Sequence, residues 1–188
     1  MEPVIRPALL KLNLGCGRRR LPGFLGVDNN QHAGPVDVVH DLDVLPWPFE
    51  ESSVAEVVMD HVLEHLDDTI RVIQELYRIC ADGAAIHVMT PHFSCNWTHP
   101  GHKRAIGVGL FDHFDPRSEE RYGDCRFAVE RLTLHWMRPR YRTSIFRKLV
   151  ATPIDWLANL HPRMCQRVWC YWVGGFDEVE FHVRVIKR

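Results

Sequence analysis

Short apolar runs separated by turns dominate the first half of the chain. Five of them have the length of buried strands, at residues 9–14, 24–27, 36–40, 54–59 and 84–90. Between the last two, apolar residues recur at helical spacing from Ile70 to Cys80. Asp67 or Asp68 is placed to cap the start of this helix. A strand, a helix and a strand in this order predict a right-handed parallel crossover.

The second half of the chain has a different pattern. Residues 91–124 are rich in His, Gly, Pro and Phe, and they are too long for a plain connection, so we expect a lid or substrate loop there. Residues 145–169 have helical character, with breaks expected at Pro153 and Pro162. Two further strands are expected, at 125–136 and 178–187.

This pattern predicts a single α/β domain over residues 1–188. We expect a cofactor-binding half, a lid and a C-terminal part of strands with a helical insertion, at 1–90, 91–124 and 125–188 respectively.

Composition excludes several classes of function. The formal net charge is −1, which gives no electrostatic case for nucleic-acid binding. No apolar run reaches the roughly 20 residues that span a bilayer, and the first residues lack the apolar core of a signal peptide. The six cysteines form no CxxC pair, so we expect free thiols. A cytoplasmic protein is the resulting expectation.

Three predicted strands end in residues suited to bind a nucleoside. The first runs into Gly15-Cys16-Gly17, where glycines let the backbone approach a ligand closely. The second ends at Asp28 and Asn29, and the third runs into Asp41-Leu42. An acidic side chain at such a strand end is placed to accept hydrogen bonds from ribose hydroxyls. In a doubly wound sheet these ends line one crevice, at the point where the strand order reverses.

The glycine loop favours S-adenosylmethionine over a dinucleotide. A dinucleotide places its pyrophosphate at a helix N-terminus and uses a third glycine for packing, but the loop reads GCGRRR. Only residues 18–23 separate it from the next strand, too few for a helix that crosses the sheet. S-adenosylmethionine has no pyrophosphate and needs no such helix.

With these residues in place, the chain resembles the class I S-adenosylmethionine-dependent methyltransferases. The segments that carry the likeness are LNLGCG, GVD, DLDVLPWPFEESSVAEVVMDHVLEHL and ELYRICADGAAIHVMTPH. They are similar to the small-molecule, type 11-like branch, and PGHKRAIGVGLFDHF and WVGGFDEVEFHVRVIK are similar to a poorly characterised subgroup. The resemblance implies a Rossmann-like, seven-stranded, mostly parallel sheet with its last strand antiparallel.

The resemblance also implies roles for individual residues. It places Gly15, Cys16 and Gly17 under the amino-acid part of the cofactor, Asp28 and Asn29 at the ribose, and Asp41 and Leu42 at the adenine. It places Asp60 and His61 at the end of the fourth strand, facing the methyl group. The early helices of the family are reduced here, so we expect residues 91–124 to close the pocket.

Histidines are the candidate catalytic groups. If the acceptor is a hydroxyl, a base helps, and His92, His102 and His61 are the candidates; each has a positioning or structural role as its alternative. His92, Cys95, His99 and His102 have the side-chain types of a zinc site, but their spacing matches no standard zinc module. We therefore predict no metal.

The sequence thus predicts a methyltransferase acting on a small-molecule or glycan-type acceptor at oxygen or nitrogen. Two alternatives stay open. One is a nicotinamide-dependent oxidoreductase, and the other is a non-catalytic protein that binds the cofactor or a metal. Basic residues surround IFRKLVATPIDWLANL. This segment is either an interfacial helix on a membrane or lipid-linked acceptor, or a helix packed on the sheet with its basic face in water. Nothing in the sequence indicates an oligomeric state.

Overall fold

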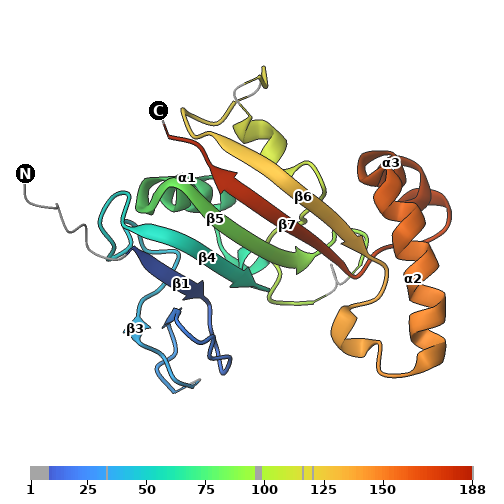
Figure 1. Ribbon diagram of the computed structural model, residues 1–188, viewed down its shortest axis with the longest axis horizontal. Helices are drawn as coiled ribbons and strands as arrows, with labels where there is room; N and C mark the ends of the chain where they lie inside the picture. The colour runs from blue at the N-terminus through green and yellow to red at the C-terminus, as the bar shows by residue number, and fades with distance from the viewer. Residues whose placement is uncertain (1–8, 33, 96–98, 116, 120, 188) are drawn as a thin grey trace, which may run out of the picture.

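The computed structural model describes residues 9–187 except 33, 96–98, 116 and 120. Seven strands form one sheet in the order β3-β2-β1-β4-β5-β7-β6 (Figure 1). Their bounds are Leu10–Leu14 (β1), Leu25–Asp28 (β2), Val38–Val39 (β3), Val54–Asp60 (β4), Cys80–Pro91 (β5), Phe127–His135 (β6) and Glu178–Val185 (β7). The order reverses at β1, which lies between β2 and β4.

The strand directions confirm the predicted fold class. β1 pairs in parallel with β2 and β4, β2 with β3, and β4 with β5. β7 runs antiparallel to both of its neighbours, β5 and β6. The sheet is therefore doubly wound and mostly parallel, with the last strand antiparallel.

One face of the sheet packs on α1, which spans Thr69–Ile79 and lies behind the sheet in Figure 1. Asp68 caps this helix by accepting a hydrogen bond from the backbone N–H of Arg71. Ile73 and Leu76 of α1 join the core cluster that also contains Phe181 of β7. This apolar layer is the main hydrophobic stabilisation of the domain.

The opposite face lacks the helices that usually cover a parallel sheet. No helix lies between β1 and β2, or between β2 and β3, in the described residues. The strands compensate with polar side chains at the alternate positions that point to this face. Lys11 and Glu56 form an ion pair at 2.7 Å on neighbouring strands, and His87 contacts Glu180 at 2.7 Å. The predicted reduction of the early helices is thus confirmed.

A partly buried ion pair holds the loop after β3 against α1. Glu75 accepts the backbone N–H of Trp47 at 2.7 Å and contacts Arg78 at 2.6 Å. The guanidinium of Arg78 also donates to the carbonyls of Trp47 and Phe49. The indole N–H of Trp47 in turn donates to the carbonyl of Leu42 at 3.1 Å. The position of Leu42 therefore depends on this clamp.

Part of the segment expected as a lid belongs to the core. Residues 106–114 pack into the core, where Ile106, Phe111 and Phe114 are buried, the last two in the short helix η2 (Leu110–Phe114). The preceding stretch returns to η1 (Leu63–His65), since the N–H groups of Lys103 and Arg104 both donate to the carbonyl of Glu64.

After β6 the chain forms η3 (Pro139–Tyr141) and two helices, α2 (Ile145–Leu160) and α3 (Pro162–Trp172), which project beyond the end of the sheet (Figure 1). The break at Pro162 is confirmed, but the break at Pro153 is wrong, because α2 continues through it. The carbonyl that Pro153 leaves without a donor belongs to Leu149, which is exposed, so water can satisfy it. No described helix has the length and apolarity to cross a membrane.

Removing the carboxylate of the clamp is expected to destabilise the domain. Glu75→Ala leaves Arg78 without its charge partner and the N–H of Trp47 without its acceptor. We expect the free energy of unfolding to fall by about 3 kcal/mol, measured by urea denaturation. Arg71→Ala, at an exposed position of the same helix, is the control and is expected to change it little. Equal stability of the Glu75 variant and the wild type would contradict the clamp.

Candidate cofactor and acceptor site

A tight glycine turn follows β1. Gly15 has φ +63° and lies against Val62, so a Cβ at this position would stand 2.3 Å from a methyl carbon of that valine. Gly17 has φ +50°, and its N–H donates to the Asp28 carboxylate at 2.9 Å. The other oxygen of Asp28 accepts the N–H of Asn30 at 3.0 Å. One carboxylate therefore joins the glycine turn to the end of β2.

A hollow of about 440 Å³ lies at the carboxyl ends of these strands. Six residues predicted for the site line it: Gly15, Asp28, Asn29, Asp41, Leu42 and His61. The remaining lining residues are His40, Asp43, Val62, His65, Leu66 and Lys103. The three chain segments predicted to bind a nucleoside thus surround one space, here called the cofactor pocket.

Three other predicted cofactor residues do not line this pocket. Cys16 is buried beneath Gly26, and a Cβ on that glycine would stand 2.9 Å from its sulfur. Gly17 engages Asp28 through its N–H, as described above. Asp60, at the end of β4, forms an ion pair with Arg19. Their assignments stay predictions, and the structure gives each of them a supporting contact instead.

His61 follows β4 with φ +57°, an uncommon conformation for a residue with a side chain. Its Nδ1 lies 3.1 Å from Glu64 and its Nε2 lies 2.6 Å from Glu178. Burial lowers the pKa of His61, but the hydrogen bonds to the two carboxylates outweigh that effect and raise the pKa to about 9. His61 is therefore an imidazolium at neutral pH.

The two carboxylates beside His61 are almost fully buried. Glu64 also accepts a hydrogen bond from the Thr90 hydroxyl at 3.1 Å, and Glu178 lies 3.3 Å from the Arg138 guanidinium. Sequence reasoning missed Glu64, Glu178 and Arg138 as parts of the site. The HVLEH segment, with Glu64 one turn after His61, carried the only local signal. Glu178 comes from the start of β7, and Arg138 directly precedes η3.

A second hollow, of about 370 Å³, adjoins the first. It is lined by His61, Glu64, His65, His99, His102, Arg138, Arg140, Tyr141 and Asp177, and we call it the polar pocket. His61 and His65 line both hollows. His65 is oriented by Gly101, whose carbonyl lies 2.8 Å from its Nδ1, and the rings of His99 and His102 stack with centroids 4.5 Å apart.

The histidine at the end of β5 lies elsewhere. His92 is completely buried, with its ring nitrogens 2.7 Å from the Ser94 hydroxyl and 3.1 Å from Gln166 of α3. Burial lowers its pKa. It lines neither of the two pockets. His92 thus joins β5 to α3, while His61 and His102 lie at the polar pocket.

The histidine-rich stretch does not assemble the zinc set weighed from the sequence. Cys95 points to Asp177, at 3.3 Å, and His92 faces Gln166. Candidate ligand atoms of Glu64, His65 and His102 do lie within 4.8 Å of one another. However, both oxygens of Glu64 already accept hydrogen bonds, from His61 and Thr90. That no metal binds stays a prediction.

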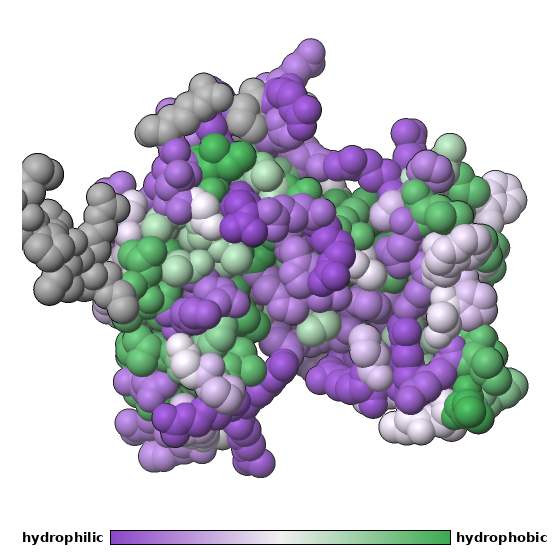
Figure 2. All heavy atoms as spheres, in the orientation of Figure 1, coloured by the Kyte–Doolittle hydropathy of each residue, from purple (hydrophilic) through white to green (hydrophobic). Residues whose placement is uncertain are grey.

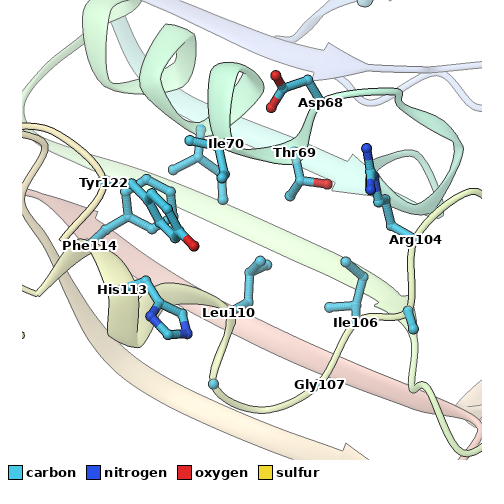
Figure 3. Close-up of a pocket in the computed structure, with 13 residues that line it drawn as sticks. Asp68, Thr69, Ile70, Arg104, Ile106, Gly107, Leu110, His113, Phe114 and Tyr122 are labelled. Atoms are coloured by element: carbon cyan, nitrogen blue, oxygen red, sulfur yellow. The ribbon is translucent and has the colours of Figure 1, made fainter. Parts of the chain in front are cut away.

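A larger hollow, of about 610 Å³, lies between the start of α1 and the segment around η2 (Figure 3). Figure 3 shows Ile70, Leu110 and Tyr122 around it, with Arg104 at its rim. None of the predicted cofactor residues lines it. Size alone therefore does not identify the site, whereas the meeting of strand ends does.

Comparison with known proteins agrees with this geometry. Residues 12–88 match the family model described as a methyltransferase domain. These residues, less than half of the chain, are therefore similar to a methyltransferase domain. The match agrees with the predicted family and with its cofactor, S-adenosylmethionine, while no acceptor is indicated. No curated protein sequence matches the chain.

Solved structures support the same fold. An S-adenosylmethionine-dependent methyltransferase from Mesorhizobium loti is 15% identical, with a TM-score of 0.53 over 94% of this chain and 91% of that one. A second S-adenosylmethionine-dependent methyltransferase, from Archaeoglobus fulgidus, is also 15% identical. Its TM-score is 0.55 over 95% of this chain and 86% of that one. The [4+2]-cyclase SpnF is 14% identical, with a TM-score of 0.58 over 98% of this chain and 78% of that one. At such identities the likeness shows the fold alone.

Neutralising the carboxylate at the end of β2 is expected to weaken cofactor binding. Asp28→Asn removes the charge and one of the two acceptors available to a ribose diol. We expect the Kd for S-adenosylhomocysteine, measured by calorimetry, to rise about tenfold, since hydrogen bonds to a charged group contribute roughly 1.5–3 kcal/mol. Asp124→Asn, at a fully exposed position, is the matched control. An unchanged Kd in the Asp28 variant would remove the ribose assignment.

Proposed function

We propose that this methyltransferase transfers the methyl group of S-adenosylmethionine to an oxygen or nitrogen atom of a small-molecule or glycan-type acceptor. The observation that carries the proposal is that the cofactor pocket and the polar pocket share His61 and His65. A donor in the first hollow and an acceptor in the second would meet at these two side chains. Methyl transfer depends on such placement of two reactants.

The residues of the cofactor pocket fit the parts of S-adenosylmethionine. The Asp28 carboxylate suits the ribose hydroxyls, and Asp41 and Leu42 suit the adenine. Gly15, which lines the same hollow, suits the amino-acid part, because a glycine lets the backbone approach a ligand closely. When bound, the cofactor supplies an electrophilic methyl group. The absence of a helix directly after the glycine turn disfavours the nicotinamide alternative, because a pyrophosphate would lack its helix N-terminus.

The three candidate catalytic histidines have different chemistry in this arrangement. His61 is already protonated at neutral pH, so it cannot accept a proton from the acceptor. It serves as a positioning residue, held between Glu64 and Glu178. His102 lines the polar pocket and is the better candidate for a base, with His65 beside it at 5.0 Å between ring centroids. His92 supports α3 from within the core.

The proposal is tested by incubating the protein with S-adenosylmethionine and a panel of hydroxyl- and amine-bearing small molecules and sugars. Formation of S-adenosylhomocysteine that requires the acceptor, and that falls in the Asp28→Asn variant, supports it. Cofactor binding without product across the panel favours a non-catalytic protein. Stabilisation by a nicotinamide cofactor, and not by S-adenosylmethionine, would overturn the proposal.

His102→Ala is expected to lower turnover more than cofactor affinity, because His102 lines only the polar pocket. General base catalysis contributes about 10²–10⁴ in rate, so we expect kcat to fall at least a hundredfold on an acceptor found in the panel. The Kd for S-adenosylhomocysteine should stay within about twofold of the wild type. A variant with undiminished kcat would exclude His102 as the base.

The charge on His61 predicts a pH dependence of stability. Its pKa is raised from 6.5 to about 9 in the folded protein. The stabilisation is therefore fully present below pH 6.5 and is lost as the pH rises through 9. We expect His61→Gln to lower the free energy of unfolding by up to about 3 kcal/mol at pH 6. The two proteins should converge by pH 10, and a constant difference from pH 6 to 10 would contradict the charged state of His61.

A further inference from the structure

The helical hairpin formed by α2 and α3 exposes an unusual amount of apolar surface. Eighteen large apolar side chains are exposed in the described part of the chain, and eleven of them lie between residues 145 and 173. These eleven form what we call the hairpin surface: Ile145, Phe146, Leu149, Trp156, Leu157, Leu160, Met164, Val168, Tyr171, Trp172 and Val173. Figure 2 shows apolar side chains gathered over these helices, at the right of the molecule. A patch of this size on a soluble domain marks an interaction site.

The exposed side chains follow one stripe on each helix. On α2, Ile145, Leu149, Trp156 and Leu160 are separated by four, seven and four residues, which places them on one face. The other face of α2 packs on the sheet: Ala158 is buried, and the side-chain amide of Asn159 donates to the carbonyl of Leu134 in β6 at 2.8 Å. The stripe therefore points away from the domain's own core.

The two stripes meet in a groove. A hollow of about 440 Å³ lies between the helices, lined by Leu157 and Leu160 of α2, by Met164 and Val168 of α3, and by Val173 after it. Its lining contains no Asp, Glu, Lys or Arg. The groove thus joins the two stripes into one continuous apolar surface.

The exposed charges around this surface have one sign. The basic residues of α2 and α3 are Arg147, Lys148, Arg163 and Arg167. Its only acidic residue, Asp155, points inward and pairs with Arg142. Arg163 contacts Asp112, but Arg147, Lys148 and Arg167 form no ion pair with any described residue. The hairpin therefore presents uncompensated positive charge beside its apolar face.

From this combination we propose that the hairpin surface docks onto an anionic lipid bilayer and lies in its interfacial plane. Trp156, Tyr171 and Trp172 are of the residue types that favour the membrane–water boundary, and lysine and arginine are attracted by anionic headgroups. A second copy of the chain is a poorer partner, because a symmetric contact would bring these like charges together. The short helix η3 contributes to the polar pocket and ends four residues before α2 begins. Docking of the hairpin would therefore bring the polar pocket toward the lipid surface.

The direct test uses the full chain and lipid vesicles, with no methyl-transfer assay. Vesicles of phosphatidylcholine alone are compared with vesicles containing phosphatidylglycerol, by sedimentation in 0.1 M and 0.5 M salt. We expect binding to the anionic vesicles at low salt, weaker binding at high salt, and little binding to neutral vesicles. Brominated lipids should quench tryptophan fluorescence in the wild type. This measurement uses the wild type alone, so it does not depend on the folding of any variant.

Matched variants assign the binding to the hairpin. Trp156→Ser together with Trp172→Ser should reduce binding to anionic vesicles at least tenfold. Leu9→Ser, at an exposed apolar position directly before β1, should not. Lys148→Glu should weaken binding fivefold or more, since each cation near such a surface contributes about 1 kcal/mol. Arg71→Glu, the same kind of charge reversal on α1, is the control and should weaken binding less.

Three results would overturn the proposal. The first is equal binding of the double tryptophan variant and the wild type. The second is a wild type that neither sediments with anionic vesicles nor shows quenching. The third is a lipid-free dimer in analytical ultracentrifugation that the double variant converts to a monomer, which would assign the surface to a second copy of the chain.

Discussion

Two carboxylates hold the site together, one on each side of the point where the strand order reverses. Asp28 accepts N–H groups from the glycine turn and from its own loop, so the ends of β1 and β2 are joined. Glu64 accepts from His61 and from Thr90, so the end of β4 is joined to β5. Asp28 is partly buried and Glu64 almost fully buried, and a charge removed from water in this way is stable only when it is hydrogen-bonded. The shapes of both pockets follow from these contacts.

The cofactor half was largely predictable from the sequence, because its residues are close together along the chain and its pattern is local. Glycines after a strand, an acidic residue at the next strand end and a capped amphipathic helix each predict their own structure. The polar pocket was not predictable in the same way. Its charged centre joins His61 to Glu178 through a contact across 117 residues, and no local pattern encodes such a contact.

One error of sequence reasoning shows that exposure changes the effect of a residue. Pro153 was expected to end a helix, yet on an exposed side the helix continues, since water replaces the lost hydrogen bond. The lid at residues 91–124 stays a prediction, and within that segment Phe111 and Phe114 are buried in the core. The polar side chains on the uncovered sheet face explain how the domain tolerates the loss of its early helices.

The central claim is that the ends of β1, β2 and the segment after β3 surround one nucleoside. A crystal structure of the chain with S-adenosylhomocysteine tests it most directly. The account predicts the ribose hydroxyls on Asp28, the adenine beside Leu42 and the sulfur directed toward His61. A ligand bound in the larger hollow near α1, or bound with its ribose away from Asp28, would contradict it.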